Sequence, residues 1–382
     1  MQTIRFDLAQ LPPEAEALRL EVRGFLAEYG AHWTRSERAR SWDGFDREFS
    51  QTIGARGWIG MTWPRQFGGG ERSALERFVV LEEMLAAGAP VSAHWIADRQ
   101  SGPLLLRYGS EEQKRTLLPR IALGELCFCI GLSEPDAGSD VAALHCVARE
   151  SESGWVLNGT KIWTTNAQHA DYMIALVRTD GEAKDRQKGL SQFLVPLSRP
   201  GVTVRPIADM TGENHFNEVV FEDVMLPSDA LLGRRRAGWT QAMEELALER
   251  SGPERFLSSI QVLACLILRL EENPSEEGWE NVGRLVAQLG TLRQMSLSVA
   301  SMLAADGNPS LEACIVKDLG TGFEQQLPEI AHRMLGLDIG LGGDTDADNA
   351  IGHLLLMAPA FSLRGGTREI LRGIIARGLG LR

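Results

Sequence analysis

LSEPDAGSD, residues 132–140, is the stretch that decides the fold, and it directly follows the apolar run LCFCIG. A proline, small residues and hydroxyl groups are packed into this one short segment, which is typical of a loop. Such a loop would expose backbone N–H groups and the hydroxyls of Ser133 and Ser139 to a ligand at close range. The segment therefore predicts a binding loop at the end of a buried strand.

A second segment, NGTKIWTTNA at residues 158–167, extends this prediction. We interpret Asn-Gly as a hairpin-like turn, followed by a strand that carries Trp163 and Thr165 on one face. An aromatic plate beside hydroxyl donors suits a flat heteroaromatic cofactor. Each feature alone also has a structural explanation, because Asn-Gly turns are common and a tryptophan in a strand is more often part of a core.

The composition excludes several classes of protein. The chain of 382 residues, with 44% hydrophobic and 24% charged residues, is typical of a soluble globular protein with two or three domains. It has no apolar run of about 18 residues and no signal-peptide pattern, so we expect neither a membrane span nor secretion. Five cysteines without framework spacing indicate reduced thiols in the cytoplasm. The net charge of -12 argues against a nucleic-acid partner, but an anionic substrate stays compatible with it.

Changes of pattern along the chain predict three consecutive domains. Residues 1–126 show helical spacing, and Ser110 is expected to cap one of these helices. Residues 127–235 contain short β-branched and aromatic runs separated by Gly, Asn, Asp and Pro, which is typical of strands. Residues 236–382 return to helical spacing. The fold class is therefore predicted to be α+β and multidomain.

Four other motifs are better explained by structure than by chemistry. DTDADN, residues 344–349, begins like a calcium loop but leads to Asn and Leu where such a loop needs Gly and Glu. CFC, residues 127–129, has no second Cys/His pair, so core packing is favoured over zinc and no metal site is predicted. LGLDIGLGG, residues 335–343, follows a helical pattern rather than a strand, which weakens a Rossmann interpretation. RRR, residues 234–236, is most simply a solvated linker.

Taken together, the motifs resemble those of the FAD-dependent acyl-CoA dehydrogenase family over nearly the whole chain. Beside the two segments above, the resemblance includes GWIGMTWPRQFGGG, GSEEQKRTLLPRIALGE, HFNEVVFEDVMLP and GGTREILRGIIARGLGL. It implies an N-terminal helical domain, a central β-barrel domain and a C-terminal four-helix bundle, with FAD at their junction. It also implies α,β-dehydrogenation of an acyl-CoA thioester to the trans-2-enoyl-CoA.

The resemblance assigns residues to the cofactor and to CoA. Leu132 and Ser133 would meet the edge of the isoalloxazine, and Trp163 and Thr165 would back its ring. Ser139 would lie near the pantetheine arm of CoA, while Thr367 and Glu369 would lie near the dinucleotide end of FAD. The full set of predicted cofactor residues is Leu132, Ser133, Gly138, Ser139, Trp163, Thr165, Thr367 and Glu369.

The catalytic base is expected at Glu249. Many family members carry the base as the glutamate of an EGT motif, but this chain has RGGT, with Gly365 at that position. A second group, exemplified by isovaleryl-CoA dehydrogenase, carries it in a LER context on a C-terminal helix, where this chain has LALERSG with Glu249 and Arg250. The Gly365 N–H and a flavin hydroxyl would bond the thioester carbonyl, and Arg250 and Gly366 would contact substrate. From the residues alone, Glu249 forming an ion pair beside a helix bent by Pro253 stays an alternative.

Two departures from the family concern assembly. The R-x-Q/T-F-G stretch, which reaches the FAD of a neighbouring subunit in homotetramers, has no match between Arg255 and Gly290. The Q-x-x-G-G-x-G loop is degraded to HRMLGLDIGLGG. The chain is thus similar to the base-bearing subunit of bacterial α2β2 members, some of which act on steroid side chains. We expect a homologous dehydrogenase subunit as partner, with a homotetramer or homodimer as alternatives, and an electron-transfer flavoprotein or similar acceptor.

Two rival functions stay open. The chain could be a non-catalytic subunit that completes the FAD site of a homologous chain. It could also be another flavoenzyme on the same fold, of the monooxygenase or nitroalkane oxidase type. LALERSG together with an intact SEPDAGSD favours the dehydrogenase.

Overall fold

The computed structural model describes residues 3–247, 250–305, 307–336 and 345–381. With these gaps, the chain divides into two compact units, and each unit is assembled from segments that are distant in the sequence. The first unit comprises residues 1–45, 72–91 and 249–382, and the second comprises residues 46–71 and 92–248. No helix within the described ranges is long and apolar enough to cross a membrane.

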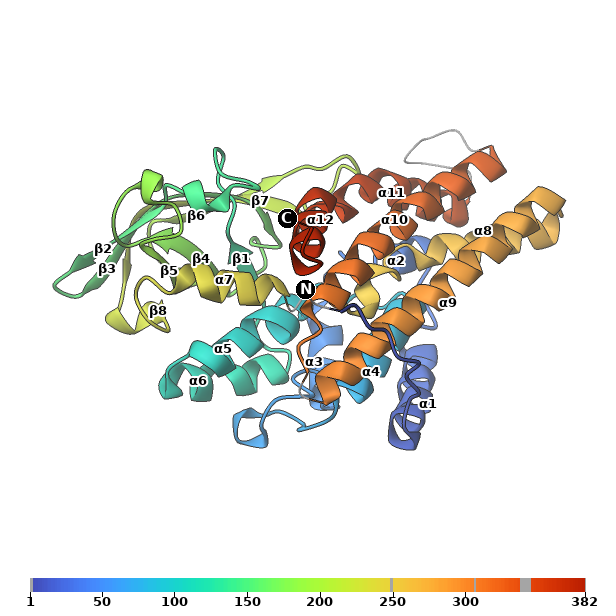
Figure 1. Cartoon of the computed structure of the whole chain (residues 1–382), viewed down its shortest axis with the longest axis horizontal. Coiled ribbons are helices and arrows are strands. Elements are labelled where there is room, and N and C mark those ends of the chain that lie inside the picture. The colour runs from blue at the N-terminus through green and yellow to red at the C-terminus, as the bar shows by residue number, and fades with distance from the viewer. Residues whose placement is uncertain (1–2, 248–249, 306, 337–344, 382) are drawn as a thin grey trace. The chain divides into compact units, whose positions relative to one another are not determined.

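The N-terminal third is helical, as its sequence pattern predicts (Figure 1). Its elements are α1 (Pro13–Tyr29), α2 (Arg35–Ala39), α3 (Arg47–Ala55), η1 (Arg65–Phe67), α4 (Ala74–Ala87), the π-helix η2 (Ala97–Ser101), α5 (Gly102–Tyr108) and α6 (Glu111–Ala122). The predicted cap is confirmed: the Ser110 hydroxyl accepts from Gln113 N, and the Gln113 side chain accepts from Ser110 N in return. This reciprocal pair satisfies two N–H groups that a helix start leaves without partners.

The middle of the chain forms one sheet of eight strands. The strands are β1 (Phe128–Gly131), β2 (Val147–Ser151), β3 (Gly154–Thr165), β4 (Tyr172–Arg178), β5 (Leu190–Pro196), β6 (Val202–Ile207), β7 (Phe216–Leu226) and β8 (Leu231–Leu232). They pair in the order β6-β7-β3-β2-β4-β5-β8, and β1 lies parallel to β4 outside this path. Short 3-10 turns, η3 (Val141–Ala143), η4 (Ala183–Asp185) and η5 (Ser228–Ala230), lie in the connections. The core of the sheet includes Leu157, Met173, Phe193 and Phe221.

Helix α7 (Gly238–Ala247) packs on this sheet. Its Ala242 belongs to a buried cluster with Leu144, Leu176 and Leu190. Contact with the sheet places α7 in the second unit, although its sequence lies beyond the boundary predicted at residue 235. The bounds of the three predicted domains stay a prediction.

The rest of the chain is helical and belongs to the first unit. Its elements are η6 (Pro253–Arg255), α8 (Ile260–Glu272), α9 (Glu276–Ala304), α10 (Ser310–Leu335), α11 (Asp346–Phe361) and α12 (Arg368–Gly378). In Figure 1, α8, α9, α10 and α11 are the long helices in orange and red, and α10 contacts each of the other three. Ala15 of α1, Phe78 of α4 and Leu297 of α9 share a further buried cluster. The predicted order of helical, β and helical parts is confirmed.

One turn was predicted wrongly. Asn158 and Gly159 lie inside β3, and the chain reverses instead between β2 and β3, where Ser151 pairs with Gly154. The Asn158 side chain bonds Asp223, donating to Oδ1 at 3.0 Å and accepting from N at 2.9 Å. Asp223 is the extra residue of a β-bulge in β7, with a φ of 48°. The Asn-Gly pair therefore accommodates a neighbour's bulge and makes no turn.

Candidate functional site

A buried ion pair holds the loop that follows β1. Glu134 and Lys161 are both buried, and their Oε1 and Nζ atoms lie 2.7 Å apart. Glu134 also accepts from the backbone N–H groups of His145 at 2.6 Å and Cys146 at 3.0 Å. Lys161 donates a second bond to the Leu132 carbonyl at 3.1 Å. The pair thus fastens the predicted binding loop to β3.

The electrostatics of this pair favour its charged form. Burial by itself would raise the pKa of Glu134. The Lys161 ammonium and the bonds from Lys161, His145 N and Cys146 N outweigh burial and hold the pKa below its ordinary value of 4.5. A carboxylate that stays ionised keeps all of its acceptor capacity, so the loop stays anchored at neutral pH.

Trp163 lies on a bulge of β3 and points outward. Between Lys161 and Thr164 the register with β7 shifts by one residue, and Trp163 has a φ of 58°. Its side chain is 57% exposed and meets the edge of Phe216, with ring centroids 6.0 Å apart. The core interpretation of this tryptophan is therefore wrong. Strain of this kind is common at ligand sites, because the surrounding structure must hold it in place.

The other predicted flavin contacts are near this bulge. Ile162 N donates to the Ser133 carbonyl at 3.0 Å, which brings the loop and the tryptophan strand together. The Leu132 side chain packs into the buried cluster under α7. Thr165 is half-buried, and Gly138 and Ser139 are exposed further along the loop. Leu132, Ser133 and Trp163 are thus gathered in one place within the second unit.

All five cysteines are buried. Burial raises the pKa of Cys127 and of Cys146 to about 12, and it raises that of Cys129 well above its usual range. These thiols stay protonated and unreactive at neutral pH. The core interpretation of the CFC motif agrees with this placement.

The predicted base, Glu249, lies outside the described residues. Before this gap α7 ends at Ala247, and after it Pro253 is the first residue of η6. The bent helix predicted around Pro253 is therefore wrong, because Gly252 is extended and a new 3-10 turn begins. Proline suits this first position because the N–H that it lacks would have no partner there.

Arg250 connects the segment after Glu249 to the predicted glycine turn. It is buried, and its Nε donates to the Gly365 carbonyl at 3.5 Å while a terminal nitrogen approaches Cys314 Sγ at 3.5 Å. Gly365 and Gly366 have φ values of 68° and 100°, which favour glycine. The structure thus brings together Arg250 and the turn of Gly365 and Gly366 within the first unit.

The start of α12 carries the predicted dinucleotide contacts. Thr367 is the N-cap, and its hydroxyl accepts from Ile370 N at 3.4 Å. Glu369 is exposed, and hydrogen bonds from its own backbone N–H and from Thr367 lower its pKa. The next residue after the cap, Arg368, donates from Nε to Asp318 Oδ1 at 2.7 Å. A helix N-terminus beside an arginine is a favourable place for a phosphate group.

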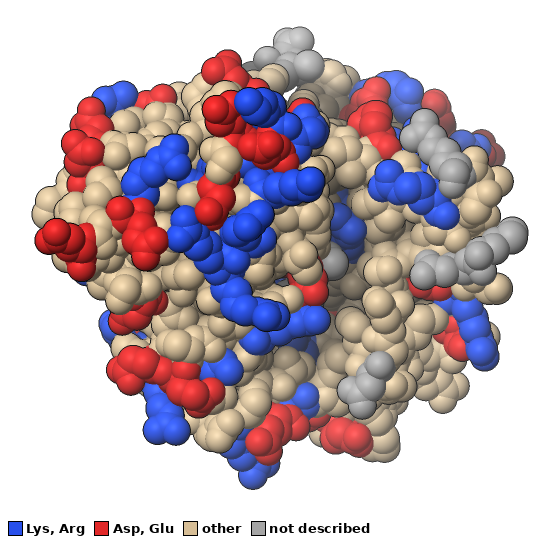
Figure 2. All heavy atoms as spheres, turned by 60° about the vertical axis from the view of Figure 1, so that its left-hand side comes forward, with Lys and Arg blue, Asp and Glu red and all other residues tan. Residues whose placement is uncertain are grey.

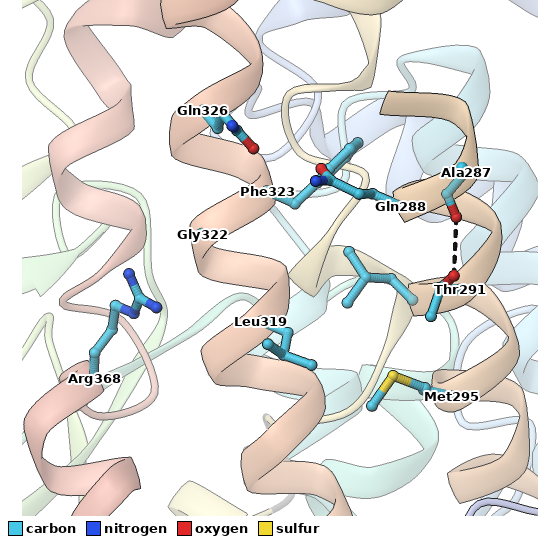
Figure 3. Close-up of a pocket in the computed structure, with 10 residues that line it drawn as sticks. Ala287, Gln288, Thr291, Met295, Leu319, Gly322, Phe323, Gln326 and Arg368 are labelled. Carbon is cyan, nitrogen blue, oxygen red and sulfur yellow. Dashed lines mark hydrogen bonds between the residues drawn. The ribbon is translucent and has the colours of Figure 1, made fainter. Parts of the chain in front are cut away.

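Arg368 also borders a cavity of about 470 Å³ between α9 and α10. Figure 3 shows Leu319 and Phe323 from α10 and Thr291 and Met295 from α9 around this space, with Arg368 on the far side of α10. The Thr291 hydroxyl is engaged with the Ala287 carbonyl at 2.9 Å. The cavity is therefore mainly apolar and carries one cation at its border.

Basic and acidic side chains are interspersed on the face shown in Figure 2. In the second unit, Arg235 bonds Asp180 at 2.9 Å and Glu150 at 3.0 Å. The three arginines of RRR are exposed in the connection between β8 and α7, which agrees with the solvated-linker interpretation, and the central one forms these surface ion pairs.

Comparisons with known proteins identify the family of this chain. Family models for the N-terminal, middle and C-terminal domains of acyl-CoA dehydrogenase match residues 12–125, 129–224 and 279–380. Acyl-CoA dehydrogenase IpdE1 of Mycobacterium tuberculosis is 33% identical over 96% of this chain and 98% of its own length. The chain belongs to the acyl-CoA dehydrogenase family. It is accordingly an oxidoreductase of this class, and the family is one of flavoproteins.

Two solved structures of the family are similar throughout the chain. The Tcur3481-Tcur3483 steroid ACAD has a TM-score of 0.87 at 28% identity, covering 98% of both chains. The ChsE4-ChsE5 complex from Mycobacterium tuberculosis has a TM-score of 0.84 at 29% identity, covering 98% of this chain and 99% of the other. The chain therefore has the acyl-CoA dehydrogenase fold.

The residues of each unit fit the FAD of an acyl-CoA dehydrogenase. In the second unit, Trp163 offers an exposed indole face next to Ser133, as a flat ring system requires. In the first unit, the α12 N-terminus offers N–H groups for phosphates, and Arg368 beside it is held by Asp318. The cofactor, when bound, supplies the acceptor for two electrons.

Sequence analysis missed the side chains that support these sites. The role of Lys161 could have been recognised from the sequence, because a charged residue in the middle of an apolar strand is unusual and needs a partner. Glu134, in the loop motif itself, is that partner. Sequence analysis also assigned no role to Arg364, which precedes the glycine turn. In the structure, one of its terminal nitrogens donates to the buried Glu324 at 2.7 Å.

Proposed function

We propose that this chain is the base-bearing subunit of an FAD-dependent acyl-CoA dehydrogenase, with Glu249 as the base. The bond from Arg250 to Gly365 carries the proposal, because it connects the two segments in which family members keep their catalytic glutamate. A glycine at position 365 leaves space for a carboxylate that arrives from the other segment. Buried Arg250 would fix the direction of the chain directly after Glu249.

The proposed reaction breaks two C–H bonds of the acyl chain and forms one C=C bond. Glu249 takes the α-proton, and desolvation by a bound acyl chain raises its basicity. The Gly365 N–H donates to the thioester oxygen and stabilises the negative charge that develops there. Bound FAD would supply the acceptor for the β-hydrogen and its electron pair. Leu132, Ser133 and Trp163 hold and orient the ring, and the product is a trans-2-enoyl-CoA.

The test is anaerobic reduction of the flavin by acyl-CoA, followed by absorbance. Glu249→Gln should retain FAD and lower the reduction rate by about 10³-fold, because a positioned general base supplies an effect of this size. Glu272→Gln at the exposed end of α8 is the matched control and should reduce at the wild-type rate. A Glu249→Gln variant that keeps more than about a tenth of the rate would contradict the assignment of the base.

The likeness to a steroid ACAD suggests which substrates to compare first. A CoA thioester with a bulky polycyclic acyl group and one with a linear chain should be tested side by side. We infer that the bulky substrate reduces the flavin faster.

We also propose a homologous dehydrogenase subunit as the obligate partner. The two similar structures are both named after two components, which supports this proposal. Val286, Leu303 and Leu319 on α9 and α10 are about half exposed, as apolar side chains at an assembly surface are before the partner covers them.

A further inference from the structure

The glycine turn has no side chain with which to fix its own position. It joins α11 to α12, and Gly365 and Gly366 both adopt positive φ values within it. Glycine has more backbone freedom than any other residue, so the direction of the Gly365 N–H depends on the neighbours of the turn.

Arg364 is the neighbour that anchors it. One terminal nitrogen donates to three acceptors: the Glu254 carbonyl at 3.1 Å, Ser258 Oγ at 2.9 Å and Glu324 Oε2 at 2.7 Å. The guanidinium also lies 4.5 Å from the ring centroids of Trp42 and Phe361. Its position is therefore fixed by an ion pair, two further hydrogen bonds and two aromatic faces.

Glu324 extends this anchor to the segment that follows the proposed base. It is 1% exposed, and its second oxygen accepts from Ser258 N at 3.0 Å. The Ser258 hydroxyl in turn donates to the Glu254 carbonyl at 2.9 Å. One carboxylate thus holds the glycine turn through Oε2 and the 254–258 segment through Oε1.

A second arginine, Arg250, makes the reciprocal bond between the same two segments. Arg250, from the segment after Glu249, donates to the Gly365 carbonyl, while Arg364, from the turn, donates to the Glu254 carbonyl. Each segment thus contributes one arginine that bonds a carbonyl of the other.

We propose that Arg364 and Glu324 are positioning residues that set the place of the Gly365 N–H relative to the proposed base. The inference rests on the proposed function, because the base and the N–H donor must act on the same thioester together. A displacement of about 1 Å in such a pair lowers the rate by up to about 10²-fold. Neither residue needs to touch the substrate.

The test uses a variant from which both charges are removed. A single substitution would leave one charge buried without its partner, which is strongly destabilising. In Arg364→Met with Glu324→Gln, the charge is balanced and the oxygen of the introduced amide can still accept from Ser258 N. We expect flavin reduction to slow by at least about 10-fold, with the dissociation constant of acyl-CoA within about threefold of wild type. Arg372→Met, at an exposed bond to Asp318, is the control and should change neither value.

Deuterium exchange supplies a measurement that does not depend on the reaction. In the full-length double variant, purified with its partner where one is required, amides of residues 362–367 should exchange at least about 10-fold faster, and those of α12 as in wild type. Unchanged exchange in 362–367, or a reduction rate that falls in proportion to a loss of affinity for acyl-CoA, would overturn the proposal. If wild type is not reduced by acyl-CoA while the exchange result holds, the proposed function fails and the anchor stands.

Discussion

Trp163 combines a strained backbone conformation with an exposed indole. A φ of 58° is unfavourable for a bulky side chain, and the exposure of the indole gains no stability from burial. The cost is offset by the bonds that hold the strand directly before Trp163, from Lys161 to Glu134 and from Ile162 to Ser133. A side chain kept in this way has a role beyond packing, and we propose that it backs the flavin.

Replacing Trp163 tests this role. Trp163→Ala removes an exposed indole, so the midpoint of thermal unfolding of the apoprotein should stay within about 3 °C of wild type. FAD should dissociate at least about tenfold more readily, because aromatic contacts of this kind contribute on the order of 1 kcal/mol or more. Flavin fluorescence during titration measures the affinity. An unchanged affinity together with an unchanged visible spectrum would return Trp163 to a structural role, and Trp279→Ala on α9 is the control.

At the scale of elements, the strand β3 shows which structural features a sequence pattern can predict. Its existence and the binding loop that precedes β2 were predicted from residue types, while the ligand-facing position of Trp163 was implied by the family resemblance. Its two irregularities were not, because each arises from the partner strand: Asn158 lies opposite the bulge at Asp223, and Trp163 lies where β3 has a residue more than β7. Register is a property of two strands, so a pattern in one of them cannot reveal it.

The Glu134–Lys161 pair gives this part of the sheet a predictable pH dependence. The folded-state pKa of Glu134 is lowered, so the stabilisation is fully present above the ordinary value of 4.5 and is lost as the pH falls through the folded pKa. Each unit of lowering corresponds to about 1.4 kcal/mol in the free energy of unfolding.

The measurement is urea unfolding between about pH 7 and pH 3 for wild type and for Glu134→Gln with Lys161→Met. Wild type should lose more stability than the double variant as the solution becomes acidic, because only wild type must protonate this carboxylate. Parallel curves would show that the pair contributes no pH dependence. Lys161→Met alone, which leaves Glu134 buried without its cation, should be less stable than the double variant by about 3 kcal/mol at pH 7.

For the whole molecule, the order of helical, β and helical parts follows from sequence pattern, but the compact units do not. Residues 72–91 join helices from the end of the chain, and α7 joins the sheet. Such associations depend on which faces are buried against each other across long sequence distances, and periodicity in one segment carries no information about them. The resemblance implies that the base segment and the glycine turn meet at one substrate, but the bond between them through Arg250 is visible only in the folded chain.

Assembly is the prediction that belongs to this scale. Expressed alone, the chain should be poorly soluble or form a dimer with little yellow colour, because the loop that reaches a neighbour's FAD has no match in it. Co-expressed with a homologous subunit, it should give an α2β2 particle with one FAD per heterodimer, and cofactor binding should stabilise the particle. Native mass spectrometry and the ratio of flavin to protein decide the matter. A yellow homotetramer of this chain with full activity and four FAD would contradict the heteromer.

Because every cysteine is buried, the native protein is well suited to labelling with one thiol-reactive probe at an introduced cysteine. Alkylating reagents require a thiolate, and the raised pKa values of Cys127, Cys129 and Cys146 withhold it, while Cys265 and Cys314 are shielded as well. A cysteine introduced at the exposed Ser139 would then be the one site that a maleimide dye can reach in the folded chain. A fluorophore placed there would sit on the loop that we expect to meet CoA, and it would report the arrival of the thioester without any change to the wild-type thiols.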